Sequence, residues 1–322
     1  MALKFYAIKN GRKPGIYTNW PQAQAQVKGF SGAKYKSFPT KEEALAYLND
    51  VTSSDSNSIV ENVSSTNADL VNKCNSIGSD ETGKGEIFRS LIVTASFVSS
   101  DNVETLEKMG VKDSKAYGKN PEKLAEIGRA LCGIDSEYDI DWNELKKGIF
   151  TRTDYASTLT IMLPNKEYES IHTETYNQDS ILVDYHLKAI EMLSDAIKNG
   201  SVEYIVIDDF MNNNRTSKKR APKYQKLQDT IADVAADAKL LIETKADARF
   251  MSVSAASIIS TYFEQLYLRH LSEILLTVHG VDIKVPDGPI NEKVRSFIKY
   301  LKANGHDEFF YEYAKVSYVK NL

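Results

Sequence analysis

The first fifty residues alternate short hydrophobic segments with turn signals, as in a small β/α unit. Strands are predicted where apolar and aromatic residues alternate, and Asn10-Gly11 and Pro14-Gly15 supply turns between them. Thr40 and Glu43 have the spacing of a capping box, which predicts that a second helix opens there. The predicted elements are strands over residues 4–8, 16–17 and 35–38 and helices over residues 21–27 and 41–48.

The hydrophobic pattern fades after residue 50. Residues 51–72 are rich in Ser, Asn and Asp, and their apolar residues are too few to bury a core. We interpret this segment as a flexible tether, which would span roughly 25 Å root-mean-square as a coil of about twenty residues. A surface helix over residues 59–70 is the alternative, because some apolar residues there have helical spacing.

Strands and helices alternate over residues 73–322, which indicates an α/β unit. Residues 91–98 are almost continuously apolar, as expected of a strand buried on both faces. The helix predicted over residues 251–271 begins with small residues, so it is expected to pack closely against another element. The other predicted elements are strands over 203–208 and 239–244 and helices over 121–131 and 180–199.

Composition bounds the class of protein. The 322-residue chain is 42% hydrophobic and 26% charged, typical of a globular protein in solution. Cys74 and Cys132 are its only cysteines, which excludes a disulfide framework and favours a reducing compartment. Without a run of eighteen apolar residues or a signal-peptide pattern, we expect a cytoplasmic protein that does not bind membranes. A monomer is the default expectation.

The net charge of −4 is unevenly divided along the chain. Residues 1–50, called the head below, hold eight Lys and Arg against three Asp and Glu, a net +5 that leaves −9 for the rest. A basic head suits a polyanionic partner, whereas clustered carboxylates in the body suit bound cations.

Two adjacent acids, Asp80 and Glu81, lie in the glycine-rich segment Gly78-Ser-Asp-Glu-Thr-Gly-Lys-Gly85. Neighbouring residues of a regular strand point to opposite faces, so both acids reach one site only if glycines allow a distortion at the strand end. A surface turn with two solvated acids is the alternative.

Further acids follow two predicted strands. Asp208 and Asp209 end the apolar run 204–207, and Asp247 follows the strand over 239–244. Each taken alone is equally explained as a turn or a helix start. Taken together, acids at strand ends fit a phosphodiesterase site with two divalent ions about 4 Å apart. Zinc is not indicated, because the five histidines are scattered: His172, His186, His270, His279 and His306.

Four segments in chain order resemble the motifs of type 2 ribonucleases H, and more closely those of the bacterial ribonuclease HIII branch. They are Gly78–Gly85, Gly110-Val-Lys-Asp-Ser-Lys115, Ile207-Asp-Asp-Phe210, and Lys245-Ala-Asp with Ser254-Ala-Ala-Ser-Ile-Ile259. The tail Ala314–Asn321 resembles that branch's Ala-Lys-x-His-Phe-x-Asn ending, with Ser and Tyr in place of His and Phe. The resemblance covers residues 77–322 and implies a ribonuclease-H-like mixed five-stranded sheet with flanking helices.

What the resemblance implies is an endonuclease that hydrolyses the RNA strand of RNA–DNA hybrids and leaves 3′-hydroxyl and 5′-phosphate ends. Two Mg²⁺ ions, with Mn²⁺ as a substitute, are expected on Asp80, Glu81, Asp208 and Asp247, and Asp209 is a bystander. Gly83, Lys84 and Gly85 match the loop that senses the ribose 2′-hydroxyl, although the ribonuclease HII branch has arginine in place of Lys84. The expected phosphate or substrate contacts are Lys112, Ser114, Lys115 and Lys315.

The head resembles the hybrid-binding domain at the N-terminus of type 1 ribonucleases H, over residues 4–48. The resemblance implies a small antiparallel β/α domain that binds an RNA–DNA hybrid and also accommodates double-stranded RNA. Its expected contacts are Tyr6, Trp20 and Tyr35 against sugar or bases and Lys36 and Ser37 on phosphate. The pairing departs from both families, because the ribonuclease HIII branch usually carries a domain with a TATA-box-binding fold.

Two alternatives stay open at this point. A catalytically silent protein that binds hybrids or double-stranded RNA has the same head, although the presence of all four acids argues against it. The basic segment over residues 212–223 either lines the path of the hybrid or is a solvated loop.

Overall fold

The computed structural model describes residues 4–10, 12–13, 15–28, 30, 33–38, 40, 44, 68–197, 201–212 and 214–319. The chain divides into two compact units, Met1–Ser58 and Ile59–Leu322.

The first unit is a three-stranded antiparallel sheet with one described helix on it. Its strands are β1 (Phe5–Asn10), β2 (Gly15–Tyr17) and β3 (Lys34–Phe38), in the order β2-β1-β3, and its helix is α1 (Trp20–Val27). Ile8 of β1 is buried against Ala23 and Val27 of α1. The predicted β/α unit is confirmed, whereas most of the helix predicted over residues 41–48 lies outside the described residues.

The second unit is built on a mixed sheet of six described strands in the order β6-β7-β5-β4-β8-β9. β4 pairs antiparallel with β5, and β8 runs parallel to both β4 and β9. The strands are β4 (Ser76–Thr82), β5 (Leu91–Val98), β6 (Ile149–Arg152), β7 (Ser157–Leu163), β8 (Tyr204–Asp208) and β9 (Lys239–Glu243). The mixed sheet is confirmed, but the expected number of five strands is one too few.

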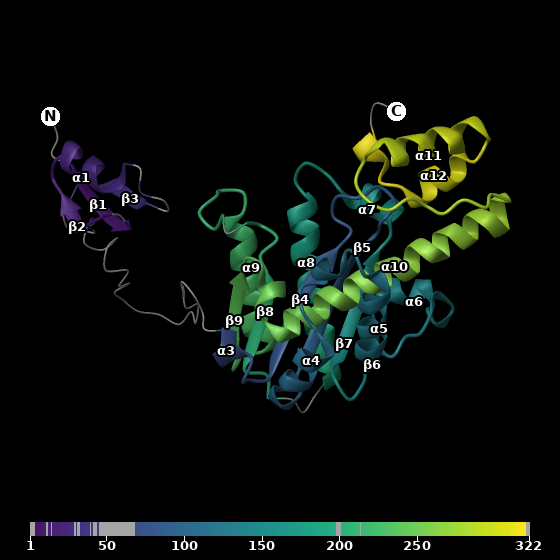
Figure 1. Ribbon diagram of the computed structural model, residues 1–322, viewed down its shortest axis with the longest axis horizontal. Coiled ribbons are helices and arrows are strands. Elements are labelled where there is room, and N and C mark those ends of the chain that lie inside the picture. The colour runs from purple at the N-terminus through teal and green to yellow at the C-terminus, as the bar shows by residue number, and fades with distance from the viewer. Residues whose placement is uncertain are drawn as a thin grey trace. The chain divides into compact units, whose positions relative to one another are not determined.

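Helices cover both faces of this sheet (Figure 1). α8 (Gln178–Ile197) and α9 (Ala221–Val234) pack on one face, where they share a core with Ile77, Val93 and Ile207. α10 (Met251–His279) runs across the other face together with α5 (Pro121–Cys132). Further described helices are α4 (Val103–Met109), α6 (Trp142–Lys147), α7 (Asn165–Ile171), α11 (Glu292–Ala303) and α12 (Asp307–Tyr313), with single turns η1 (Ser100–Asn102), η2 (Ser114–Tyr117), η3 (Glu137–Asp139), η4 (Ala246–Ala248) and η5 (Val316–Val319).

The predicted tether ends earlier than residue 72. Residues Ala68–Val71 form the short helix α3, and Val71 is completely buried in a cluster with Val206, Leu241 and Phe250. Asn72 fixes the start of α10, because its side chain accepts a hydrogen bond from the Met251 N–H at 2.9 Å and donates to the Arg249 carbonyl at 3.2 Å. Residues 51–67 lie outside the described residues.

The small residues at the start of α10 allow the close packing that the sequence predicts. A Cβ placed on Gly78 of β4 would lie 2.2 Å from the Ser252 carbonyl carbon and 2.2 Å from the Val253 nitrogen. Ser76 and Ser252 join across the same contact through a 2.9 Å hydrogen bond between their hydroxyls. β4 and α10 therefore meet backbone to backbone next to the acid pair. Among the described helices, none is both long enough and apolar enough to cross a membrane.

Candidate active site

The four predicted carboxylates come from three neighbouring segments at one edge of the sheet. Asp80 and Glu81 lie near the end of β4, and Asp208 is the last residue of β8, the parallel neighbour of β4. Asp247 lies in η4, directly after β9. Asp80, Glu81 and Asp247 are buried and Asp208 is partly buried, so the alternative of solvated turn acids is excluded.

The acid pair needs no backbone distortion. β4 keeps its register with β5 from Ser76 to Thr82, and the first positive φ in this segment is +80° at Gly83, after both acids. Asp80 faces α10, where it is hydrogen-bonded to Ser257, whereas Glu81 faces α8, where it meets His186. Both nevertheless line the same cleft with Asp208, because they lie at the end of the strand.

Burial and mutual repulsion make two of these carboxylates, Asp80 and Asp208, hard to ionise without a cation. Burial raises the pKa of Asp80 well above its usual value, and the nearby charges of Glu81 and Asp208 raise it further. Burial, followed by the charge of Glu81, raises the pKa of Asp208 to about 6. A divalent cation would relieve this repulsion.

Glu81 is held in the ionised state by two partners. The His186 ring shares a 2.8 Å hydrogen bond with Glu81 Oε2 through Nε2 and a 2.7 Å hydrogen bond with Ser79 Oγ through Nδ1. Lys84 forms an ion pair with Glu81 Oε1. Although burial raises the pKa of Glu81, the hydrogen bond with His186 and the charge of Lys84 lower it to about 2.

The other two carboxylates also have partners. Asp247 Oδ2 accepts a 2.7 Å hydrogen bond from Lys115 Nζ, and Asp208 Oδ1 accepts one of 2.7 Å from the Ala246 N–H. In the part of the chain that the structure describes, no three Asp, Glu, His or Cys converge into a ready metal site. The donor set itself fits Mg²⁺ or Mn²⁺, since both prefer carboxylate oxygen, with Lys84 and Lys115 as competing cations.

A cleft of about 570 Å³ collects most of the predicted catalytic residues. Its wall also contains Thr261 of α10, whose hydroxyl donates to Ser114 at 3.1 Å, while Ser114 and Ser257 share a 3.0 Å hydrogen bond. Eight of the predicted residues line the cleft: Asp80, Glu81, Gly83, Lys84, Gly85, Ser114, Lys115 and Asp208. Asp247 joins the cleft through its ion pair with Lys115.

Two predicted phosphate contacts lie elsewhere. Lys315 is completely buried, and its ammonium group donates to three backbone carbonyls, so its predicted role as a phosphate contact is wrong. The exposed Lys112 does not line the cleft, and its ammonium lies 5.3 Å from the centroid of the Tyr117 ring. Asp209 turns away from the cleft and accepts hydrogen bonds of 2.7 and 2.9 Å from the Tyr224 hydroxyl.

His186 is a site residue that sequence reasoning missed. It occupies an apolar face of α8, where a histidine is ordinarily a core residue, and it stacks on Phe210 with centroids 4.9 Å apart. A buried histidine needs partners for both ring nitrogens, and this requirement is the signal that could have linked it to a buried acid.

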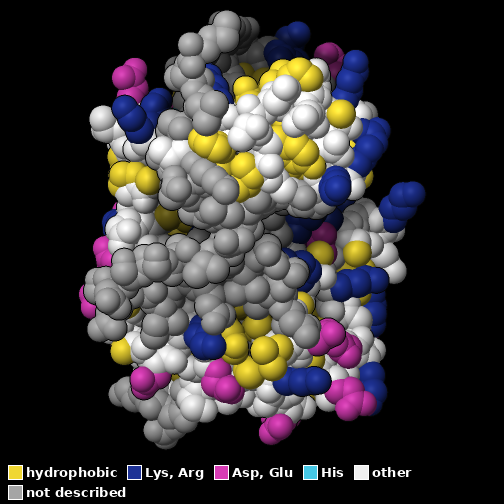
Figure 2. Space-filling model, turned by 90° about the vertical axis from the view of Figure 1, so that its left-hand side faces the viewer, with side chains coloured by type: hydrophobic (Ala, Val, Ile, Leu, Met, Phe, Trp, Pro, Cys, Tyr) yellow, Lys and Arg dark blue, Asp and Glu magenta, His cyan; other side chains and the backbone are white. Residues whose placement is uncertain are grey.

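The head residues form a row of aromatic rings. The Tyr6 and Trp20 centroids are 5.2 Å apart, and those of Trp20 and Tyr35 are 5.7 Å apart. Tyr35 is 46% exposed, and Lys36 and Ser37 beside it are exposed too. Figure 2 shows basic and acidic side chains interspersed on the lower part of the face that it draws.

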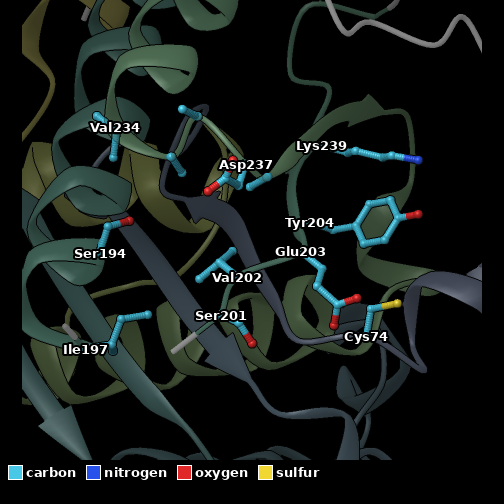
Figure 3. Close-up of a pocket in the computed structure, with 13 residues that line it drawn as sticks. Cys74, Ser194, Ile197, Ser201, Val202, Glu203, Tyr204, Val234, Asp237 and Lys239 are labelled. Carbon is cyan, nitrogen blue, oxygen red and sulfur yellow. The ribbon is translucent and has the colours of Figure 1, made fainter. Parts of the chain in front are cut away.

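A second cavity of about 670 Å³ lies at the opposite edge of the sheet. It is formed by the ends of α8 and α9 and the starts of β8 and β9 (Figure 3). Glu203, Tyr204 and Lys239 line it, together with Cys74, and none of the predicted site residues does.

Comparison with known proteins agrees with this fold. The family model of ribonuclease HII matches residues 77–303, and the model of the ribonuclease H1 N-terminal domain matches residues 4–48. The chain therefore belongs to the ribonuclease HII family and is a type 2 ribonuclease H, a hydrolase that depends on divalent metal ions.

Within that class, the curated relatives are named ribonuclease HIII. The protein from Staphylococcus haemolyticus (strain JCSC1435) is 28% identical over 281 residues, which cover 87% of this chain and 78% of the relative. The protein from Lactococcus lactis subsp. lactis (strain IL1403) is 30% identical over 233 residues, 72% of this chain and 66% of the relative. The predicted resemblance to the ribonuclease HIII branch is confirmed.

Solved structures show the same fold. Bst-RNase HIII in complex with Mn²⁺ matches with a TM-score of 0.58 at 22% identity, over 94% of this chain and 80% of that one. A mutant protein of Bst-RNase HIII matches with a TM-score of 0.59 at 24% identity, over 90% of this chain and 81% of that one. The predicted ribonuclease-H-like α/β fold is thereby confirmed.

Proposed function

We propose that this ribonuclease H cleaves the RNA strand of RNA–DNA hybrids internally at the cleft between β4, β8 and α10, leaving 3′-hydroxyl and 5′-phosphate ends. The observation that carries the proposal is the gathering of Asp80, Glu81 and Asp208 in one cleft, where burial and repulsion raise the pKa of two of them. Such a set is costly to bury unless it serves cation binding.

Asp80, Glu81, Asp208 and Asp247 would hold two Mg²⁺ ions, for which Mn²⁺ can substitute. When bound, the ions would activate water and stabilise the leaving oxygen. His186 fixes one oxygen of Glu81, so the other stays directed toward Lys84 and the cleft. Lys84 and Lys115 would leave their carboxylates when cations bind and would become available to substrate phosphates.

Gly83, Lys84 and Gly85 would distinguish RNA from DNA. They line the cleft beside the acid pair, and Gly83 comes so close to the Ser90 carbonyl that a Cβ there would lie 1.9 Å from its oxygen. A backbone held this tightly can present its N–H groups to the ribose 2′-hydroxyl, the group that separates the two nucleic acids.

The head, over residues 1–50, would bind the hybrid through Tyr6, Trp20 and Tyr35, with Lys36 and Ser37 on phosphate. A row of rings beside exposed lysine suits sugar or base stacking combined with backbone contact. Joined to the catalytic unit by the tether, it would raise the affinity for hybrids through effective concentration and would also accept double-stranded RNA. We further propose a cytoplasmic monomer.

The test follows cleavage of a labelled RNA strand paired with DNA, with Mg²⁺ and separately with Mn²⁺. Asp80→Asn and Asp208→Asn should abolish cleavage, whereas Asp209→Asn should retain it, because Asp209 is bound to Tyr224 outside the cleft. An all-RNA duplex tests whether the enzyme instead acts chiefly on double-stranded RNA. A wild-type chain inactive with both ions would refute the enzyme, and equal loss in Asp208→Asn and Asp209→Asn would refute the assigned carboxylates.

A further inference from the structure

The C-terminal segment donates hydrogen bonds to the backbone carbonyls of the loop between β4 and β5. Lys315 Nζ donates to the carbonyls of Gly83 at 2.6 Å, Glu86 at 3.0 Å and Arg89 at 2.5 Å. The backbone N–H of Lys315 also donates to the Ile87 carbonyl, at 2.8 Å. A single residue more than 220 positions away thus contacts four carbonyls of this loop.

Lys315 is suited to this role and to no contact with solvent or substrate. It is completely buried, and its ammonium lies 5.8 and 5.9 Å from the centroids of the Tyr168 and Tyr318 rings. Burial lowers the pKa of Lys315 to about 8, so the ammonium form prevails at pH 7. Its three N–H donors then match three carbonyl acceptors, which satisfies the buried group.

The carbonyl between the two glycines is held as well. Lys84 contributes the next carbonyl of the loop, which accepts hydrogen bonds from Gln178 Nε2 at 2.8 Å and from the Tyr318 hydroxyl at 3.0 Å. Tyr318 lies in η5, three residues after Lys315, so the C-terminal segment supplies donors to both Gly83 and Lys84.

Fixing the carbonyls also fixes the amide donors. In a planar trans peptide the C=O and the following N–H point in opposite directions. The Gly83 and Lys84 carbonyls point to the side-chain donors of Lys315 and Tyr318. The N–H groups of Lys84 and Gly85 therefore point away from these donors. The Gly85 N–H already donates to an oxygen, Glu86 Oε2, at 3.0 Å, and Gly85 itself lines the cleft.

We propose that Lys315, assisted by Tyr318, is a positioning residue for ribose recognition: by holding the carbonyls of the Gly83–Arg89 loop, it sets the direction of the Lys84 and Gly85 N–H groups that receive the 2′-hydroxyl oxygen. The proposal rests on the proposed function of this loop. Lys315 is buried and does not line the cleft, so its effect lies in the preference for ribose over sugars that lack the hydroxyl.

The experiment compares wild type with Lys315→Met, which keeps the length of the side chain and removes its donors. Lys299→Met, on the exposed face of α11, is the matched control for loss of a lysine. The substrates are two hybrids, one with an all-ribose RNA strand and one with a 2′-fluoro sugar at the nucleotide 5′ to the cleaved bond. Mn²⁺ binding without nucleic acid and hydrogen exchange of residues 83–89 are measured in parallel.

Lys315→Met should lower kcat/KM on the ribose strand by roughly 100-fold, as expected of a misplaced contact, and should bring the ribose-to-fluoro ratio toward one. Exchange of residues 83–89 should quicken while Mn²⁺ affinity stays within about twofold, since no ligand is touched. Lys299→Met should match wild type. Should Lys315→Met fail to fold, Tyr318→Phe removes one donor to Lys84 and should lower the same ratio by about two- to tenfold.

An unchanged ribose-to-fluoro ratio in a folded Lys315→Met protein, or unchanged exchange, would overturn the proposal even if total activity fell. A wild-type enzyme that cleaved both strands equally would refute the role of the loop itself and, with it, the role of Lys315. If the wild type prefers ribose and Lys315→Met keeps that preference, the proposed function of the loop remains supported and only the positioning role of Lys315 is refuted.

Discussion

The contact between β4 and α10 can be tested by adding one methyl group at Gly78. Alanine would place a Cβ 2.2 Å from the backbone of both Ser252 and Val253 and 2.6 Å from the Ser252 oxygen. These are backbone atoms at the start of a 29-residue helix, so no side chain can rotate away to make room. To reach ordinary contact at 3.4 Å, the strand and the helix must separate by about 1.2 Å.

The separation has two measurable consequences. Overpacking of this kind costs about 1–3 kcal/mol, and the upper end is expected because both sides are backbone. Gly78 and Asp80 share one face of β4, and the start of α10 follows Asp247 directly, so the same shift moves Asp80 relative to Asp247. Since a displacement of 1 Å can cost about 100-fold in rate, kcat/KM should fall by roughly that factor.

Urea denaturation gives the stability of Gly78→Ala, and the hybrid cleavage assay gives kcat/KM. Gly85→Ala is the control for stability, because a Cβ at Gly85 meets nothing within 4 Å and its φ is not positive. The control should unfold within about 0.5 kcal/mol of wild type. The packing argument is wrong if Gly78→Ala loses no more stability than Gly85→Ala.

Two further predictions concern buried groups beside the cleft. Burial raises the pKa of Glu264 to about 8 despite its ion pair with Arg89. Between about pH 4.5 and 8, Glu264 is therefore protonated in the folded chain and ionised in the unfolded chain. Wild-type stability should therefore fall with rising pH in that window relative to Glu264→Gln, by at most ~1.4 kcal/mol per unit. Urea denaturation at several pH values measures this difference, and parallel curves for the two proteins would contradict it. His186→Phe keeps the stacking on Phe210 but loses both hydrogen bonds, so Mn²⁺ affinity should drop by about 10- to 100-fold in calorimetry. Binding equal to wild type would show that His186 does not orient Glu81.

The parts of the fold that the sequence predicts well depend on local signals. β5 and β8 are apolar runs of the length of a buried strand, and α8 and α10 have long helical patterns. β6 is different, because its four residues alternate between partly buried and exposed at the edge of the sheet. So short a signal is common in loops, and only its pairing with β7 makes it a strand.

The site residues divide in the same way. Asp80, Glu81 and Asp208 lie at or near the ends of strands that are neighbours in the sheet. The general rule that functional groups gather at strand ends therefore predicts that they share one site, and the structure places them in one cleft. The partner of Glu81 could not be found by that rule. His186 comes from a helix on the far side of the sheet, and its role depends on the packing of α8 against β4, which no local pattern specifies.

Lys115 and Lys315 show why the role of a basic residue in a motif cannot be inferred from its charge alone. Both lie in motifs that resemble the family, yet Lys115 reaches Asp247 in the cleft while Lys315 is buried behind the loop. The ribonuclease HII model matches residues 77–303 and stops before Lys315, although this residue holds four carbonyls of the glycine loop. A protein cut at the end of the matched region would keep all four carboxylates and lose the hydrogen bonds from Lys315 to the Gly83–Arg89 loop. The residues that shape this candidate active site therefore include those that hydrogen-bond to its backbone, and some of these residues lie in the C-terminal segment.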